Sequence, residues 1–191
     1  MEKNLYIISG CNGAGKTTAS YTVLPEVLNC KEFVNADEIA RGLSPFNPED
    51  VAIEAGRLML QRTEILLERG MSFSIETTLA ARSYVNLVKR AQTKGYSVRI
   101  LFFWLNSPEL AVIRVAERVA GGGHNIPEQV IRRRYVAGIK NLFALYIKQV
   151  DYWDIYDNSG HPRKHIACGG KSAKTTIFDE STFANIKSYV R

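Results

Sequence analysis

The chain has 191 residues, 46% of them hydrophobic, which suits one domain with a substantial core, and no apolar run approaches the roughly 20 residues of a membrane span. Three scattered cysteines (Cys11, Cys30 and Cys168) argue against a disulfide framework, and the first residues show no signal-peptide pattern, so we expect a cytoplasmic protein. The formal net charge of +6 would suit nucleic acid, anionic lipid or a phosphorylated small molecule, but neither a basic tail nor an interleaved aromatic–basic stripe is present, which disfavours nucleic acid and membranes.

Residues 10–17 fit the phosphate-loop pattern G-x-x-x-x-G-K-S/T. Residues 4–9 before them are typical of a buried strand, and a helix is predicted from Thr17 to Leu24, where Pro25 ends it. Glycines let such a loop turn tightly, so that several backbone N–H groups and the start of the helix face one phosphate. Because the whole pattern stands in this setting, the alternative of a turn that binds nothing is disfavoured.

The side chains of this loop suggest individual roles. Lys16 brings a positive charge to the outer phosphates of a nucleoside triphosphate, and the Thr17 hydroxyl is a candidate ligand of Mg²⁺. The residues that we expect to bind the nucleotide here are Gly10, Cys11, Asn12, Gly13, Ala14, Gly15, Lys16, Thr17 and Thr18.

The second predicted strand, residues 31–37, ends on the carboxylate of Asp37. Ligands of open α/β sheets lie beyond the carboxyl ends of the strands, so Asp37 is expected near the phosphates if this strand neighbours the first. The residues alone leave three roles open for Asp37: a base for a substrate hydroxyl, a water-mediated ligand of Mg²⁺, or a cap of the next turn. Residues 41–47, with Pro45 and Pro48 as breakers, are predicted as loop.

A long helix is predicted from the capping residue Asn47 to about Arg69, and a third strand follows at residues 71–78. This strand ends in Glu76-Thr77-Thr78, which faces the phosphate site if the sheet is parallel. Glu76 and the two hydroxyls could bind Mg²⁺ through water or hydrogen-bond a substrate, and local turn capping is the simpler alternative. Residues 80–94 are predicted as the next helix.

A near-continuous apolar run at residues 98–105 predicts a strand covered on both faces of a parallel sheet. Two helices are predicted after it, at residues 106–120 and 126–150, joined by the glycine-rich residues 121–125. We expect this helix–loop–helix, about 107–150, to act as a lid that brings arginines onto a transferring phosphoryl group.

Several arginines gather around the glycine-rich loop. Arg114 and Arg118 are four residues apart and share a helix face. Consecutive arginines on a helix point in different directions, so at most two of residues 132–134 can face the site, and we expect the rest to pair with acids such as Glu117 or Glu128. The candidates are Arg114, Arg118, Arg132, Arg133 and Arg134.

The C-terminal part, about residues 161–191, is predicted to form a hairpin and a closing helix. Between the lid and this part, a fifth strand is expected at 152–156 and a loop at 157–160. Within this part, short strands are expected at 165–168 and 175–178, and a helix from Ser181. Five strands that alternate with helices predict a single α/β domain over residues 1–191, with a doubly wound, mostly parallel sheet. His161, His165 and Cys168 have spacings found in metal sites, but no fourth ligand is nearby, so zinc is disfavoured.

With these segments in place, the chain resembles the zeta-toxin-like P-loop kinases, in their short bacterial branch. The segments that carry the resemblance are residues 10–18, 33–37, 73–78, 114–134 and 156–159. The phosphate loop is generic, whereas the ordered set of the other segments is specific. The resemblance implies a P-loop NTPase fold, with Mg²⁺ as cofactor and ATP or GTP as phosphoryl donor.

Zeta-type kinases phosphorylate the sugar 3′-hydroxyl of UDP-N-acetylglucosamine, so the resemblance implies a small-molecule hydroxyl acceptor. By position, Asp37 matches the catalytic base, Lys16 the phosphate-loop lysine, and Arg118 a lid arginine. Glu76 and Thr78 match residues that hold the substrate. The full set that we expect is Lys16, Asp37, Arg118 and Arg133 for catalysis, Glu76, Thr77, Thr78, Arg82 and His124 for the substrate, and Asn158 on the adenine side.

The sequence departs from the family pattern at two positions. Where the toxins carry a second lid arginine this chain has His124, so Arg132, Arg133 or Arg134 would compensate, and the substrate-side arginine is displaced to Arg82. These changes leave phosphoryl transfer in place and put the sugar-nucleotide substrate in question. The fused antitoxin domain of some relatives is not visible, so the expected partner is a separate antitoxin protein.

The first functional hypothesis is a cytoplasmic kinase that transfers a γ-phosphoryl group to a small-molecule hydroxyl. The alternative is a nucleotide-dependent switch or NTPase with a macromolecular partner such as nucleic acid, which the basic charge would permit.

Overall fold

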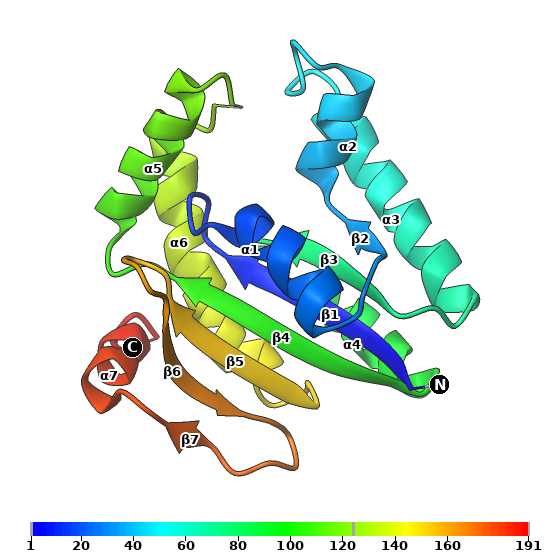
Figure 1. Cartoon of the computed structure of the whole chain (residues 1–191), viewed down its shortest axis with the longest axis vertical. Coiled ribbons are helices and arrows are strands. Elements are labelled where there is room, and N and C mark those ends of the chain that lie inside the picture. The colour runs from blue at the N-terminus through cyan, green and yellow to red at the C-terminus, as the bar shows by residue number, and fades with distance from the viewer. Residues whose placement is uncertain (1, 124, 191) are drawn as a thin grey trace.

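The structure is a computed structural model that describes residues 2–123 and 125–190. Within these residues a single sheet of seven strands carries helices on both faces (Figure 1). The order across the sheet is β2 (Phe33–Val34), β3 (Phe73–Thr77), β1 (Lys3–Gly10), β4 (Tyr96–Trp104), β5 (Tyr152–Asp157), β6 (Lys164–Gly169) and β7 (Thr176–Ile177). The pairings from β2 to β5 are parallel, whereas β6 and β7 join by antiparallel pairings. The predicted mostly parallel α/β fold is confirmed, and the predicted C-terminal hairpin extends the same sheet.

The helical segments alternate with the parallel strands, as the sequence predicts. They are α1 (Lys16–Thr22), η1 (Val23–Val27), α2 (Ala36–Leu43), α3 (Ala52–Glu68), α4 (Tyr84–Thr93), α5 (Pro108–Ala120), α6 (Glu128–Asn141), η2 (Leu142–Tyr146) and α7 (Glu180–Ser188), where η denotes a π-helical turn. Figure 1 shows α1 in front of the sheet and α6 behind it, while α2 with α3 and α5 with α6 rise on either side of the strand ends that carry the phosphate loop.

The central strands are buried because helices cover both of their faces. In β1 the side chains of Leu5, Ile7 and Ile8 are at most 1% exposed, and β4 is buried from Ile100 to Trp104. Such uninterrupted apolar runs are typical of parallel strands. The register sets Ile8 of β1 beside Glu76 of β3, so the polar end of β3 lies next to the start of the phosphate loop.

Helix starts follow local capping rules at three places. The Ser107 side chain accepts from the Leu110 N–H at the start of α5, with Pro108 in the first turn, and Asp179 accepts from the Thr182 N–H at the start of α7. At the start of α2, the Asn35 side chain accepts from the Asp37 N–H at 2.9 Å.

The largest correction to the predicted elements concerns the second strand. Only Phe33 and Val34 pair as β2, and Asp37 lies in the first turn of α2 rather than at the end of a strand. Residues 41–47, predicted as loop, include the last turn of α2, which ends at Leu43. The short strand depends on its pairing with β3, a non-local contact that composition does not reveal.

Several helix boundaries also differ from the prediction, and Pro25 does not end the first helical segment, because it lies within η1. α3 begins at Ala52, because residues 48–51 form turns, and the long helix predicted to Val150 passes into the π-helical η2 at Leu142. α4 begins four residues late, at Tyr84. Here Leu79 has a positive φ of 56°, and Asn141 donates to the carbonyls of Leu79 and Ala80, which holds this segment out of the helix.

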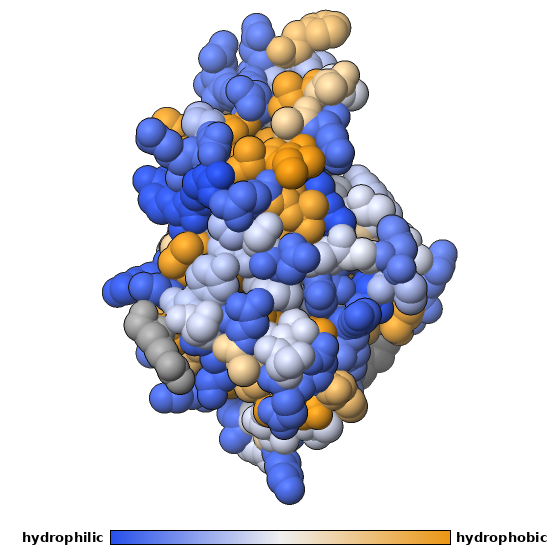
Figure 2. Space-filling view, turned by 90° about the vertical axis from the view of Figure 1, so that its left-hand side faces the viewer, coloured by the Kyte–Doolittle hydropathy of each residue, from blue (hydrophilic) through white to orange (hydrophobic). Residues whose placement is uncertain are grey.

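The surface is predominantly polar on the side that α5 and α7 form, with one apolar patch in the upper half of the view (Figure 2). Among the described residues, none of the helices combines the length and apolar character needed to cross a bilayer.

Candidate active site

The phosphate loop begins where β1 ends, and its glycines are required by the local geometry. Gly10 has φ 140°, and a Cβ there would lie 2.1 Å from the carbonyl oxygen of Phe103. Gly15 has φ 75°, and a Cβ there would lie 2.6 Å from the side-chain nitrogen of Asn158. Both positions combine a positive φ with too little room for a Cβ atom, so they require glycine. With glycine there, the loop makes the tight turn expected of a phosphate cradle.

Lys16 lies at the first turn of α1 and is only 7% exposed. Its ammonium donates to the Cys11 carbonyl at 2.9 Å, across the loop, and lies 3.7 Å from Glu76 Oε1. The positive charge is therefore held over the loop, where the outer phosphates of a bound nucleotide would lie.

Glu76 connects the loop to the neighbouring strands. Its carboxylate accepts from the Thr17 hydroxyl at 2.9 and 3.1 Å and from the Asn35 side-chain amide at 3.0 Å. Burial raises the pKa of the Glu76 carboxyl, an effect that the nearby charge of Lys16 and the Thr17 hydrogen bond only partly offset. A hydroxyl beside a carboxylate is a donor set that fits Mg²⁺, which prefers oxygen ligands and retains several waters.

A cleft of about 650 Å³ opens above the loop. Its lining comes from the loop, from α1, from α2, from the end of β3 and from α5. The charged residues that line it are Lys16, Asp37, Glu38, Arg41, Glu76, Arg114 and Arg118. The structure thus brings the predicted Lys16, Asp37, Glu76 and Arg118 to one cavity.

A second cavity of about 200 Å³ adjoins the first, and Asn12, Lys16, Asp37 and Glu76 line both. Its other lining residues are Asn35, Ala36, Met59, Thr77, Thr78, Tyr84 and Arg134. The predicted Thr77 and Thr78 are therefore placed beside Asp37. The hydroxyl oxygens of Thr77 and Thr78 also accept from the backbone N–H groups of Leu79 and Ala80, so the turn capping considered from the sequence is present as well.

Asp37 lies between the two cavities, and one of its three candidate roles is taken by another residue. The cap of α2 is Asn35, to which the Asp37 backbone N–H donates. The Asp37 carboxylate is left facing both cavities, where it raises the pKa of Glu76 further and favours the charged form of Arg134. A base or a water-mediated metal ligand remain the roles that fit this position.

The candidate arginines divide by position. Arg118 lines the large cleft, and Arg134 lines the small cavity and donates to the Asn12 side chain at 3.3 Å. Arg132 instead pairs with Glu109 and Glu128 on the exposed surface, as expected for one member of the cluster.

Two expectations for site residues are not met, and one lies outside the described chain. Among the described residues, Arg133 lines neither cavity, and its neighbour Arg134 occupies the position expected for it. Arg82 is exposed and likewise lines neither. His124 falls outside the residues that the structure describes.

Sequence reasoning also missed residues that the structure places in the site. Asn35 carries a recognisable capping signal, Asn before a helix, but the acid two residues later is the stronger functional signal. Tyr84 and Met59 come from helices whose inward faces only the packing reveals; the Tyr84 hydroxyl lies 3.8 Å from the Met59 sulfur.

The side chain of Asn158 contacts the phosphate loop. Its side-chain amide donates to the Ala14 carbonyl at 2.8 Å, directly under the loop. Arg114, which also lines the cleft, donates to the carbonyls of Asn158 and Ser159 at 2.8 and 2.9 Å. The loop after β5 is thus tied to the phosphate loop and to α5.

Replacing Asn158 by alanine should weaken nucleotide binding by about two- to tenfold, since a hydrogen bond of this kind contributes about 0.5–1.5 kcal/mol. Titration calorimetry with ATP and Mg²⁺ measures the effect. Asn185→Ala, on an exposed position of α7, is the matched control and should bind like the wild type. Equal affinities for the two variants would show that Asn158 does not hold the loop.

Replacing Glu76 by glutamine should separate stability from metal binding. The pKa of Glu76 is higher in the folded chain than in the unfolded chain. The free energy of unfolding therefore falls as the pH rises from the unfolded-state pKa through the folded-state pKa. Glutamine does not ionise, so the substitution removes this loss. We expect the difference in melting temperature between about pH 5 and about pH 7.5 to shrink in the variant. The stabilisation that Mg²⁺–ATP adds at neutral pH should fall, and an unchanged Mg²⁺ response would contradict the assignment.

Comparison with known proteins shows the family and the fold. Residues 1–165 match the family described as Zeta toxin. An uncharacterised protein of Haemophilus influenzae is 29% identical over 135 residues, which cover 71% of this chain and 94% of that protein.

Several solved structures share the fold. A chain of the AvrRxo1-ORF1:AvrRxo1-ORF2 complex with sulphate ions has a TM-score of 0.80 at 16% identity, over 98% of this chain and 64% of that one; the same complex with ATP gives 0.78. A chain of the PezAT toxin–antitoxin system of Streptococcus pneumoniae has a TM-score of 0.68 at 16% identity, over 98% of this chain and 78% of that one. Likeness at this identity shows the fold, and this chain spans less than two thirds of the AvrRxo1 chain. The family match over most of its length shows that the chain belongs to the zeta toxin family.

Proposed function

We propose that this protein is a nucleotide-dependent kinase that transfers the γ-phosphoryl group of ATP or GTP to a hydroxyl of a small molecule. The observation that carries the proposal is the position of Asp37. Its carboxylate is not the cap of α2, and it lies on the boundary between the cleft over the phosphate loop and the smaller cavity beside it. A carboxylate there can accept the proton of a hydroxyl that enters from the smaller cavity.

The phosphate-loop residues would bind the nucleotide and orient its terminal phosphate. Thr17 and, through water, Glu76 would hold Mg²⁺, which offsets the negative charge on the phosphates. Lys16, Arg118 and Arg134 line the cavities from different elements, so their charges can surround the phosphoryl group as it moves. Catalysis would rest on positioning and electrostatic stabilisation, with Asp37 as the base.

A sugar hydroxyl is the acceptor that the smaller cavity fits best. Hydroxyl and amide groups line it, from Asn35, Thr77, Thr78 and Tyr84, together with the carboxylates of Asp37 and Glu76. The resemblance to zeta toxins favours UDP-N-acetylglucosamine among such acceptors. The exposed position of Arg82 is the observation against that particular sugar nucleotide, because the residue contributes nothing to either cavity.

We propose a separate antitoxin protein as the macromolecular partner, in a cytoplasmic setting. The support is the family match, together with the relative that comes from a toxin–antitoxin system. A partner that covers the large cleft would block nucleotide entry, since Arg118 and Arg41 line that cleft and are reached from solvent.

The test is transfer of labelled γ-phosphate from ATP or GTP to a metabolite extract and a sugar-nucleotide panel, with products identified by mass spectrometry. We expect a phosphorylated small molecule that depends on Mg²⁺ and disappears with Lys16→Ala. Release of inorganic phosphate without an acceptor product, together with salt-sensitive binding to RNA or DNA tighter than the roughly 10⁻⁴–10⁻⁶ M of non-specific complexes, would instead support a nucleotide-dependent switch.

A further inference from the structure

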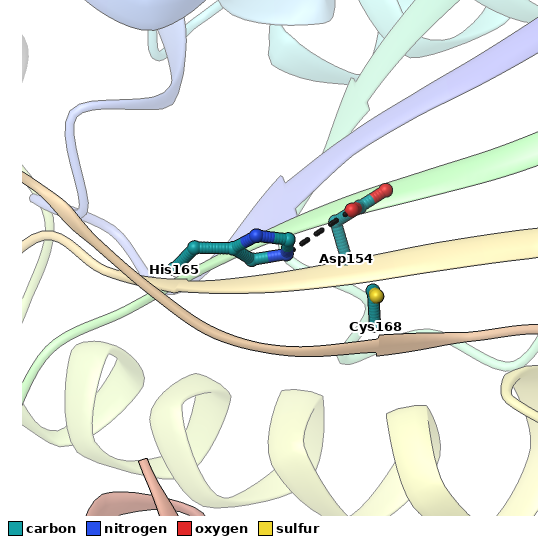
Figure 3. Close-up of side chains that lie close together, drawn as sticks. All are labelled: Asp154, His165 and Cys168. Carbon is teal, nitrogen blue, oxygen red and sulfur yellow. Dashed lines mark ion pairs between the residues drawn. The ribbon is translucent and has the colours of Figure 1, made fainter. Parts of the chain in front are cut away.

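Three side chains with metal-binding chemistry converge on β5 and β6, apart from the residues that line the proposed active site. They are Asp154, His165 and Cys168, and their nearest ligand atoms all lie within 4.8 Å of one another. Figure 3 shows the imidazole and the carboxylate directed at each other, with the thiol beside them. The sequence suggested His161 as a companion of His165 and Cys168; in the structure the third group is Asp154, from the neighbouring strand.

An irregularity in strand pairing brings these residues to one face of the sheet. Asp154 is paired directly with Cys168, and Tyr156 with His165, with a shift of register between Ile155 and Tyr156. In a regular strand, residues 165 and 168 would point to opposite faces, because side chains alternate. The extra residue of a β-bulge re-aims the side chain beyond it, so His165 joins Asp154 and Cys168 on the same face.

The His165 ring is fixed in position by two aromatic neighbours. It stacks on Tyr156 at 4.6 Å between ring centres and contacts Phe178 at 4.7 Å. Its Nε2 atom is buried and forms no hydrogen bond within the described part of the chain, although Asp154 Oδ1 is 3.2 Å away. That separation is close to the distance of about 3.4 Å between two ligands of one tetrahedral zinc ion with bonds of about 2.1 Å.

The surroundings suit a metal ligand set. The other carboxylate oxygen of Asp154 lies 3.4 Å from Arg99 Nε, which is the kind of outer contact that orients a ligating carboxylate. A nitrogen, a sulfur and an oxygen ligand together favour zinc over Mg²⁺ or Ca²⁺.

We propose that Asp154, His165 and Cys168 bind one Zn²⁺ ion, with water as the fourth ligand. The ion would join β6 to β5 at the antiparallel edge of the sheet. Because the end of β5 leads to Asn158, which supports the phosphate loop, the ion would stabilise the strand from which that support extends.

The test uses the full chain, stripped with a chelator and titrated with Zn²⁺ and with Co²⁺ in excess Mg²⁺. We expect one equivalent of bound ion and, with Co²⁺, a thiolate charge-transfer band. His165→Gln and Cys168→Ser should each weaken Zn²⁺ binding by more than about tenfold, and Cys168→Ser should abolish the band. Circular dichroism confirms that each variant is folded.

Matched controls separate this site from chance binding. His161→Gln, in the exposed loop before β6, and Cys30→Ala, in the buried core, should leave affinity and spectrum unchanged. The proposal is overturned if no stoichiometric ion binds, if the band persists in Cys168→Ser, or if His161→Gln weakens binding as much as His165→Gln. A simple Arg99–Asp154–His165 ion network would give the first of these results.

Discussion

Replacing Asp37 by asparagine is expected to lower the turnover of phosphoryl transfer by about 10²–10⁴-fold, the usual contribution of a general base. The substitution keeps the size of the side chain and removes its negative charge together with its ability to accept a proton. The start of α2 should be unaffected, because its cap is Asn35. The Asn35 side chain accepts from the backbone N–H of residue 37, which the substitution retains. Initial rates with labelled ATP, together with nucleotide affinity by calorimetry, measure the two effects separately.

Glu38 offers a matched control for this substitution. It follows Asp37 in the same helical turn and lines the same cleft, but its carboxylate pairs with Arg41 at 3.1 Å. Glu38→Gln should therefore change turnover by less than about threefold, the scale of a surface ion pair. Undiminished transfer by Asp37→Asn would remove Asp37 from the role of base and leave it as a metal-associated group.

Replacing Arg134 by alanine is expected to lower turnover by about 10³-fold, within the range known for arginines that stabilise a transferring phosphoryl group. Arg134 reaches the small cavity from α6 and contacts Asn12 of the phosphate loop, beside Lys16 and Asp37. Burial lowers the pKa of its guanidinium, and the charge of Asp37 works against this shift, so the group keeps its positive charge at neutral pH.

Arg132, two residues earlier on the same helix, provides the comparison. Its guanidinium is engaged by Glu109 and Glu128 at the surface, so Arg132→Ala should retain at least about half of the wild-type turnover. If instead Arg132→Ala and Arg134→Ala lost activity equally, the helix would act as a whole, and no single lid arginine could be assigned to the phosphoryl group.

The parts of the site that could be predicted from the sequence are those whose signal is local. The phosphate loop is specified within eight consecutive residues, because the glycines, Lys16 and Thr17 each meet a steric or electrostatic requirement of the same short segment. Glu76 could be placed near the loop because a parallel sheet brings strand ends together, and the pairing of Ile8 with Glu76 shows that arrangement.

The parts that could not be predicted depend on packing between distant segments. The choice between Arg133 and Arg134 depends on the rotation of α6, which is set by the burial of Ile131, Tyr135 and Ile139 against the core. Neither arginine carries a local signal that distinguishes it from the other.

The group on β5 and β6 illustrates the same limit. Asp154 is eleven residues from His165 in sequence and reaches it only because the strands pair with a register shift. The spacing of residues 161, 165 and 168 in the sequence favoured His161, which lies in the exposed loop before β6. A metal site assembled across strands therefore leaves little trace in the order of the residues.

A crystal structure with a non-hydrolysable ATP analogue and Mg²⁺ tests the central claim most directly. It should place the terminal phosphate between Lys16 and Arg134, with room for an acceptor oxygen about 3–3.5 Å from the γ-phosphorus and within hydrogen-bond reach of Asp37. A terminal phosphate directed away from Asp37, with no path from it into the small cavity, would contradict the proposed reaction.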